Sequence, residues 1–190
     1  MTGCSFDWHK IADAAWEKVT GQEEEIEQEE DTEEYIHHIP EAEIQAEADR
    51  VAGVICDAFS AKNADILKEL FSEYTHEQHN LDEEIADAFK FLDGEIVSIG
   101  DIQAGYSGGS NSAKYGEVET KFSGTIYDVV TENGKNYSIY FDAYYNYRLH
   151  DDRVGVYGIN VIDEAVSINR AGERPGGKVS IGGPYTMVIE

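Results

Sequence analysis

Hydrophobic residues recur every three or four positions in the first half of the folded region, which we expect to begin near Glu41. This spacing is typical of helices that bury one face. The stripes of three successive helices are Ile44, Ala48, Val51, Ala52, Ile55 and Phe59; Ile66, Leu67, Leu70 and Phe71; and Ile85, Ala88, Phe89 and Leu92. Asn63 is placed to cap the second helix. The third begins at Asn80, with Glu83 completing a capping box, and ends at Gly94.

After Gly94 the period changes from helical to alternating, which predicts strands. The predicted strands are Glu95–Ile102, Glu117–Thr131, Lys135–Arg148 and Arg153–Asp163, with turns at Glu132-Asn133-Gly134 and His150-Asp151-Asp152. Gln103–Gly116 is predicted as a Gly/Ser-rich loop. Three helices followed by an antiparallel meander is an α+β pattern. In the Gly-rich segment Ser167–Glu190, only Tyr185–Ile189 is a candidate strand.

Composition divides the chain into three parts. Residues 1–40 precede the first helix and include Gln22–Glu34, where nine of thirteen residues are acidic. Such a block repels itself and buries little apolar surface, so we expect a flexible tether. The segment Trp8–Val19 is an alternative short amphipathic helix. The α+β domain is expected at residues 41–165, followed by a Gly/Pro-rich extension at residues 166–190.

The chain is strongly acidic, with 39 Asp and Glu against 14 Lys and Arg and a net charge of −25. Nucleic-acid binding depends on basic side chains that neutralise phosphates, so this charge argues against a nucleic-acid partner. No apolar run approaches the roughly 20 residues that span a bilayer. Of the two cysteines, Cys56 lies in a helical pattern and is expected to be a small buried side chain.

Cys4 has a different context, because Thr2-Gly3-Cys4 matches the last three positions of the box that ends a bacterial lipoprotein signal peptide. Small residues are needed there so that the peptidase reaches the bond before the cysteine. The chain as given carries neither the basic nor the apolar region of a signal peptide, and we expect these to lie upstream. We therefore predict lipidation of Cys4 and an extracytoplasmic, membrane-anchored protein. The alternative is a cytoplasmic protein with an ordinary exposed Cys4.

Three stretches carry a family resemblance: Val54–Ser72, VICDAFSAKNADILKELFS; Asn80–Ser98, NLDEEIADAFKFLDGEIVS; and Val154–Val161, VGVYGINV. Across roughly Glu41 to Asp163 the chain resembles a family of small lipoproteins from Gram-positive bacteria that is grouped as a domain of unknown function. That family is similar to the nuclear-transport-factor-two-like cone, in which three helices pack on a curved antiparallel sheet. The resemblance implies such a fold, with a pocket at its wide end, but no activity.

Gly105-Tyr106-Ser107-Gly108-Gly109 satisfies the G-x-S-x-G pattern of a hydrolase nucleophile elbow. Ser107, Asp142 and His150 also follow the chain order of the corresponding triad. That motif requires a helix directly after the serine, and none is predicted here. We therefore expect a hairpin loop.

Histidines offer no convincing metal site. His76 and His79 are spaced to share a helix face, and His37 and His38 add two nitrogens. No third ligand stands at a defined spacing from them. We expect surface histidines, with no bound metal and no cofactor.

Tyrosine is the clearer signal on the strand Lys135–Arg148. Its alternation predicts one face that packs on the helices or lines a pocket: Tyr137, Ile139, Phe141, Ala143, Tyr145 and Tyr147. The opposite face is predicted to carry Tyr140, Asp142, Tyr144, Asn146 and Arg148, and its aromatic character suggests a homodimer contact. The candidate pocket residues are Tyr127, Tyr137, Phe141, Tyr145, Tyr147 and Tyr157, because such side chains combine apolar area with a polar tip.

Asp128 is the weak catalytic candidate. It shares a predicted strand face with Phe122, Ile126 and Val130. An acid on an apolar face needs a partner or a shifted pKa. Paired with Tyr145 or Tyr157, it would imitate the acid and tyrosine of ketosteroid isomerase. The alternative is that the register slips near the strand end and Asp128 points to water.

The sequence favours a lipid-anchored binding module that holds a small molecule or peptide in a cone-shaped pocket. One alternative is an enzyme of the isomerase or dehydratase type that uses Asp128. Another is a non-catalytic interaction protein of the cell envelope that dimerises through its sheet face. An enzyme needs a sealed polar pocket with a pKa-shifted acid, whereas an interaction protein needs a filled interior and an exposed apolar face.

Overall fold

The computed structural model describes residues 39–112, 117–167 and 175–183. Within these ranges it contains α3 (Glu41–Ala61), α4 (Ala64–Lys68), α5 (Glu73–Gln78), α6 (Leu81–Phe91), β1 (Ile96–Ser98), β2 (Ile102–Ser112), β3 (Glu117–Thr131), β4 (Asn136–Tyr147), the short 3-10 helix η1 (Asp151–Arg153), β5 (Gly155–Asp163) and β6 (Lys178–Gly182). The described part therefore has four α-helices and a six-stranded antiparallel sheet, which confirms the predicted α+β class. None of the described helices is long and apolar enough to span a bilayer.

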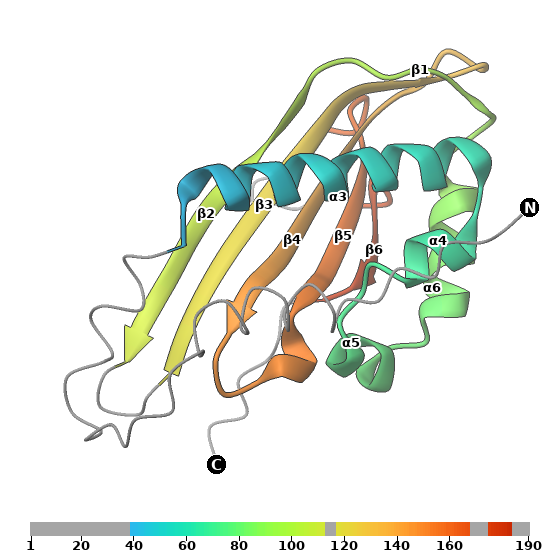
Figure 1. Cartoon of the computed structure of the whole chain (residues 1–190). Coiled ribbons are helices and arrows are strands. Elements are labelled where there is room, and N and C mark those ends of the chain that lie inside the picture. Colours follow the sequence, from blue (N-terminus) through green and yellow to red (C-terminus); the bar gives the residue numbers. More distant parts are fainter. Residues whose placement is uncertain (1–38, 113–116, 168–174, 184–190) are drawn as a thin grey trace, which may run out of the picture. The chain divides into compact units, whose positions relative to one another are not determined.

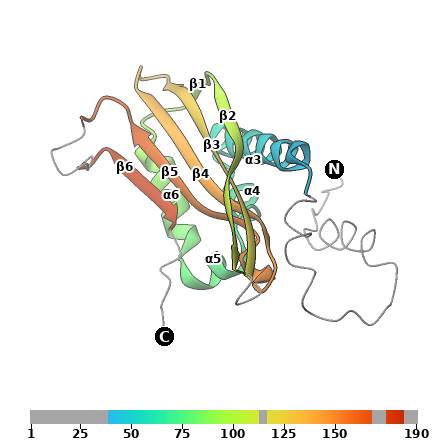
Figure 2. The ribbon, with the colours of Figure 1, turned by 90° about the vertical axis from the view of Figure 1, so that its left-hand side faces the viewer.

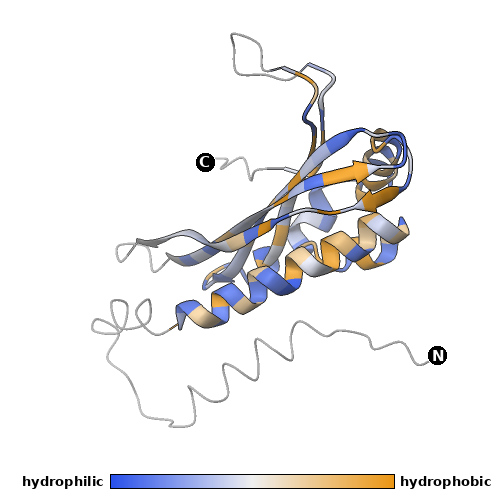
Figure 3. Ribbon diagram, turned by 90° about the horizontal axis from the view of Figure 1, so that it is seen from above, coloured by the Kyte–Doolittle hydropathy of each residue, from blue (hydrophilic) through white to orange (hydrophobic). Residues whose placement is uncertain are grey.

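Helix α3 forms as its stripe predicts. All six predicted apolar positions are buried, together with Ala58. The helix lies across β2 and β3 on one face of the sheet (Figure 1), and hydrophobic and hydrophilic positions alternate along it (Figure 3). It ends at Ala61 and is capped by Lys62, which adopts a left-handed conformation with φ of 49°. The buried stripe therefore fixes which side of the helix is left for the surface.

The helices after α3 differ from the prediction. Leu70 and Phe71 were predicted to be part of the second helix, but α4 ends at Lys68 and neither residue is helical. Phe71 instead bridges Val156 of β5, with Ser72 N donating to the Val156 carbonyl at 3.0 Å. This backbone pairing replaces the hydrogen bonds that a longer helix would have made. Ser72 then caps α5, a helix that the sequence did not predict.

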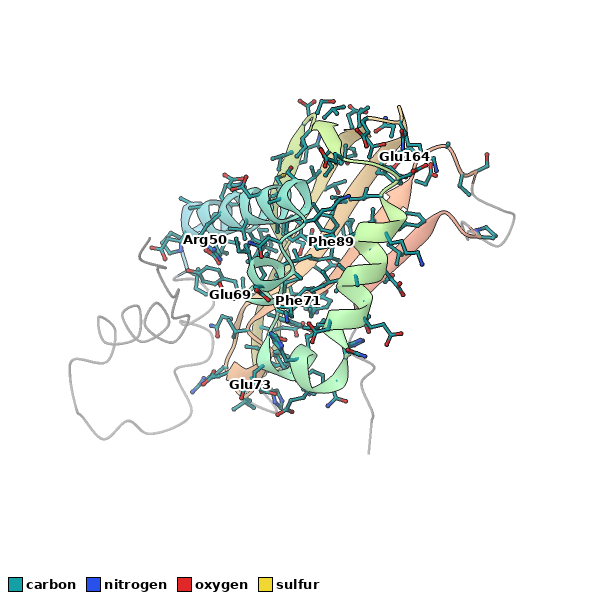
Figure 4. All side chains as sticks on the ribbon, turned by 90° about the vertical axis from the view of Figure 1, so that its right-hand side faces the viewer. Arg50, Glu69, Phe71, Glu73, Phe89 and Glu164 are labelled. Carbon is teal, nitrogen blue, oxygen red and sulfur yellow. The ribbon has the colours of Figure 1, made fainter. Side chains whose placement is uncertain are left out.

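Helix α6 begins after Asn80 as predicted, but the predicted capping box is wrong. The Asn80 side chain makes no cap hydrogen bond and instead donates to Glu83 Oε2 at 3.0 Å. Helix α6 packs against β6. Figure 4 looks onto this helical side, where Phe71 and Phe89 are labelled.

The strand order is β1-β3-β4-β5-β6, and β2 also pairs with β3. Strands β1 and β2 therefore follow one another along the same edge of β3 (Figure 2). The predicted Gly/Ser-rich loop at Gln103–Gly116 is wrong, because β2 occupies Ile102–Ser112 and pairs with β3 along its length. Strand propensity is low for glycine, but the ladder to β3 outweighs it. The turn at Glu132–Gly134 is confirmed, with Gly134 at a φ of 76°.

Strand β6 continues the sheet beyond β5, in the segment that the sequence placed after the domain end at residue 165. Its pairing runs from Gly158↔Gly182 to Ile162↔Lys178. Ile181 of this strand is fully buried. The candidate strand Tyr185–Ile189 lies outside the described residues, as do most of the tether and the helix Trp8–Val19.

Three bulges cross the sheet within two rungs of Phe122. The register shifts leave one extra residue in each of three strands: Ser107 in β2, Tyr145 in β4 and Tyr157 in β5. A bulge bends its strand and reverses the alternation that follows it. After Tyr145, Tyr147 pairs with Glu119 on the face away from the helices. The predicted face assignment is therefore wrong after Tyr145, from Asn146 onward.

Apolar side chains fill the space between the helices and the sheet. Ile55, Ile85, Phe141 and Ile159 are all 0% exposed. Gly124 makes room for the Phe141 ring, because a Cβ at position 124 would lie 2.4 Å from a ring carbon. The interior is thus packed as a hydrophobic core.

Candidate functional site

An open groove of about 810 Å3 lies between the first half of α3 and strand β2. It is lined by Glu41, Ala42, Gln45 and Asp49 of α3, by Ile102, Gln103, Ala104, Gly105 and Tyr106 of β2, and by Ser123 of β3. The helix residues recur every three or four positions, so they form one ridge beside the buried stripe. The groove therefore joins a helix side to a sheet edge.

Gln45 connects the two walls of the groove. Its Nε2 donates to the Ala104 carbonyl at 2.9 Å and to Asp49 Oδ1 at 2.9 Å. Glycine at position 105 leaves room for this amide, since a Cβ there would lie 2.7 Å from Gln45 Oε1. The Ala104 carbonyl must point away from β3, because it accepts from a helix side chain. A backbone acceptor of the edge strand is thus directed into the groove.

Exposed apolar side chains gather at this edge of the sheet. The described residues include six exposed large hydrophobic side chains: Ile66, Val97, Ile102, Tyr106, Tyr127 and Leu149. Four of them belong to β1, β2 or the adjoining part of β3, and Ile102 and Tyr106 line the groove at 44% and 55% exposure. The charged groove residues are Glu41 and Asp49, with no basic side chain in the lining. The groove therefore combines apolar area with negative charge.

A compact tyrosine cluster occupies the opposite face of the sheet. Tyr144 lies between Tyr147 and Tyr157, with ring centroids 5.0 Å away in both cases. Lys121 Nζ is 4.9 Å from the Tyr144 ring centroid and 3.0 Å from Glu119 Oε1. Tyr144 and Tyr147 are only 7% and 5% exposed, so their neighbours cover most of the aromatic area that was expected to be available on this face.

Next to this cluster, Tyr140 and Asp142 form a polar pair. The Tyr140 hydroxyl donates to Asp142 Oδ1 at 2.6 Å. Burial raises the pKa of Asp142 above its usual value, although the hydrogen bond from Tyr140 opposes this shift. Burial, followed by the bond and charge of Asp142, raises the pKa of Tyr140 to about 12. Asp142, whose pKa is raised, therefore lies on the outer face of the sheet and not in the interior.

The candidate pocket residues are spread over several places. Tyr137 and Phe141 are core residues at 1% and 0% exposure. Tyr145 lies on the helical side, where burial and the neighbouring Glu43 and Glu47 raise its pKa. Tyr147 and Tyr157 belong to the outer tyrosine cluster, and Tyr127 is 37% exposed beside a bulge. The structure does not bring these six residues together.

Asp128 is exposed in a bulge of β3 and has a φ of 52°. Its Oδ1 accepts a hydrogen bond from Asn136 Nδ2 at 3.0 Å. The structure thus agrees with the alternative in which the register slips and Asp128 points to water. Its proposed pairing with Tyr145 or Tyr157 is not among the contacts of the described residues.

The G-x-S-x-G stretch is not a nucleophile elbow. Ser107 is the bulged residue of β2, and the strand continues to Ser112 after it where an elbow would turn into a helix. Asp142 bonds to Tyr140, while the His150 ring packs on Tyr147 with centroids 4.9 Å apart. The three residues that follow triad order therefore do not make the contacts of a triad.

Neither histidines nor Cys56 suggests further chemistry. His76 Nε2 is 3.0 Å from the Lys68 carbonyl, and His79 Nδ1 is 3.1 Å from Glu84 Oε1. Within the described ranges, no group of three or more His, Cys, Asp or Glu could hold a metal. Burial, with a smaller effect of Asp57, raises the pKa of the half-buried Cys56 thiol to about 11. Cys4, His37 and His38 lie outside the described residues.

Sequence reasoning missed the groove residues Glu41, Gln45 and Asp49. Their spacing places them on one polar side of α3, but that pattern is typical of any solvated helix face. The useful signal was the alternation of Ile102, Ala104 and Tyr106, which was obscured by the glycines around it. Only the pairing of β2 with β3 shows that Ile102, Ala104 and Tyr106 form one wall of the groove.

Comparison with protein families gives a match that covers much of the described domain. The model of a domain of unknown function, DUF5104, matches residues 54–164, which is more than half of the chain. This range covers the C-terminal part of α3, from Val54 to Ala61, the other described helices and strands β1 to β5. No curated protein matches the chain. The chain therefore belongs to the DUF5104 family.

Proposed function

We propose that the protein is a non-catalytic binding domain that takes its ligand in the groove between α3 and β2. The observation that carries this proposal is the contrast between a filled interior and an open groove. Phe141 and Ile159 are fully buried in the interior, whereas Ile102 and Tyr106 expose apolar area in a groove that Glu41 and Asp49 also line. Exposed apolar area beside a few polar groups is typical of binding sites.

A nuclear-transport-factor-two-like cone is part of this proposal. It is supported by the helices on one face of a bent antiparallel sheet. The ligand site is then displaced from the wide end of a cone to its edge, because core side chains occupy the interior. The isomerase or dehydratase alternative receives less support, since Asp128 is exposed and Asp142 lies on the outer face.

The binding proposal is tested by native mass spectrometry of the full chain after exposure to cell-envelope extract. Asp49→Lys reverses a charge in the groove, and Asp87→Lys makes the same change at an exposed position on α6. We expect a retained mass on the wild type and on Asp87→Lys, and its loss from Asp49→Lys. Retention on all three proteins, or on none, contradicts a ligand in the groove.

The location is a separate part of the proposal. We propose that a lipid on Cys4 anchors the domain at the extracytoplasmic face of a membrane, with residues 1–40 as the tether. The test is fatty-acid labelling of the protein expressed with its native upstream region. Label that is lost in Cys4→Ala supports the anchor. Label that persists in that variant, or no label in the native protein, contradicts it.

A further inference from the structure

The sheet has two unlike edges, and the β2 edge is the more open one, because a groove separates part of it from α3. Strand β6 at the other edge is five residues long, begins with Lys178 and packs against α6, with Gly182 N donating to Glu84 Oε2 at 2.6 Å. Strand β2 has eleven residues, and among the described residues it pairs with β3 alone. Edge strands are usually shielded by charge, proline or a covering element. Strand β2 contains neither a charged residue nor proline.

The regular part of this edge is Ile102–Tyr106, because the bulge at Ser107 interrupts the strand. In an antiparallel ladder the N–H and C=O of one residue point to the same side. The Ala104 carbonyl points into the groove, as its bond to Gln45 shows. The Ala104 N–H therefore points there too, and the period of two extends this orientation to Ile102. These groups are the donors and acceptors that an added strand would use.

The side chains of this segment indicate what would lie against them. Ile102 pairs with Ile126 and Tyr106 pairs with Phe122, so both project on the helical face of the sheet. On that face the groove is bounded by Glu41 and Asp49. A Lys or Arg side chain from an added strand would lay its aliphatic stem on Ile102 or Tyr106 and direct its charge to these carboxylates. The Tyr106 ring offers a cation–π contact as well.

We propose that the groove receives an extended, Lys- or Arg-bearing peptide segment that adds as a strand to the edge of β2 at Ile102–Tyr106. This inference rests on the proposed function and names its ligand class. In this mode backbone hydrogen bonds supply affinity and alternate side chains supply specificity. An N–H of the peptide takes the Ala104 carbonyl in place of the Gln45 amide. In the free protein the Gln45 side chain therefore occupies the Ala104 carbonyl, which is the acceptor that the peptide would use.

Charge decides between such a peptide and a second copy of this chain. Pairing of two β2 edges would bring the Glu41 and Asp49 carboxylates of both copies to one interface. The chain carries a net charge of −25, and β2 itself has no basic residue to offset these acids. Like charges brought together across an interface oppose association. A basic segment from another protein has the complementary charge.

The test uses the full chain and three short synthetic peptides: one of alternating Lys and Val, one of alternating Glu and Val, and the Lys–Val peptide with alternate backbone nitrogens methylated. Binding is measured by calorimetry, and amide exchange in β2 by NMR. We expect the Lys–Val peptide to bind and to slow exchange at Ile102 and Ala104. The Glu–Val peptide should not bind. Methylation removes backbone donors and should weaken binding at least about fivefold.

Protein variants separate charge from general effects. Asp49→Lys should lower the affinity for the Lys–Val peptide about tenfold or more. Asp87→Lys should leave that affinity within about twofold of the wild type. If the methylated peptide binds as tightly as the parent, or exchange at Ala104 is unchanged, strand addition is overturned. Concentration-dependent protection of Ala104 without peptide would show that a second copy occupies the edge, which also overturns it.

Failure of this inference is distinguishable from failure of the proposed function. If no peptide binds but envelope extract still gives a retained mass that Asp49→Lys abolishes, the groove is a binding site for another ligand class. In that case strand addition is overturned and the proposed function stands. If no peptide binds and the mass retained from the extract is the same on the wild type and on Asp49→Lys, both strand addition and ligand binding in the groove are contradicted.

Discussion

Removing the Phe141 ring tests whether the interior is a packed core or a ligand pocket. Phe141 is 0% exposed and meets Phe122 edge to face, with ring centroids 6.3 Å apart and an interplanar angle of 74°. Truncation of a buried Phe to Ala costs about 3–5 kcal/mol. Because the aromatic contact is lost too, we expect Phe141→Ala to lower the free energy of unfolding by about 4 kcal/mol. That loss corresponds to a fall in Tm of roughly 8–16 °C.

Gly124 makes this experiment sharper. A methyl group at position 124 collides with the Phe141 ring at 2.4 Å, so Gly124→Ala alone should cost about 1–3 kcal/mol. In the double variant the methyl enters the space that the ring has left. The cost of the pair should therefore fall short of the sum of the single costs by about 1–3 kcal/mol.

The assay is urea denaturation followed by far-ultraviolet circular dichroism. Tyr106→Ala is the surface control, since Tyr106 is 55% exposed and its truncation should stay within about 0.5 kcal/mol of wild type. A cost below about 1 kcal/mol for Phe141→Ala would mean that the ring lines open space. Strict additivity of the two core changes would also refute the close contact between ring and strand.

Three further predictions concern single groups. Because the Cys56 pKa is raised to about 11, its thiolate fraction at pH 8 is about a hundredfold below that of an ordinary thiol. In the Cys4→Ala variant, where Cys56 is the remaining thiol, alkylation should therefore be about a hundredfold slower than for an ordinary thiol. A normal alkylation rate would contradict burial of Cys56. Tyr140 should ionise near pH 12 in an ultraviolet titration, and Asp142→Asn should lower that pKa because it removes a charge that opposes the phenolate. The Tyr137 hydroxyl accepts a hydrogen bond from Asp93 N at 3.1 Å and donates one to the Phe91 carbonyl at 3.2 Å. Tyr137→Phe should therefore lower the free energy of unfolding, measured by urea denaturation, by about 1–2 kcal/mol. An unchanged free energy of unfolding would contradict these bonds.

Local patterns predicted the elements whose periodicity is uninterrupted. The apolar stripe of α3 identified its buried face, and the turn at Glu132–Gly134 separated β3 from β4 at the correct place. Strand β2 was missed because its glycines have no intrinsic strand preference, and only long-range pairing with β3 makes them a strand. Strand β6 was missed for a similar reason, since its short sequence gains stability from β5.

The site was harder to predict than the fold. One extra residue at Tyr145 moves Tyr147 to the outer face, and nothing in the alternating sequence marks that bulge. The groove depends on Gln45 and Ala104, which are 59 positions apart in the sequence and meet only in the folded chain. Side chains that looked suited to a pocket, such as Phe141, are instead used to fill the core.

Methyl NMR of the full chain tests most directly whether a ligand occupies the groove and not the interior. Ile102 and Ala104 report on the groove, while Ile139 and Ile159 report on the core with similar methyl groups. On addition of cell-envelope extract, we predict shifts at Ile102 and Ala104 and unchanged signals from Ile139 and Ile159. Shifts centred on Ile139 and Ile159, with Ile102 unchanged, would show that the ligand enters the interior and would contradict this account.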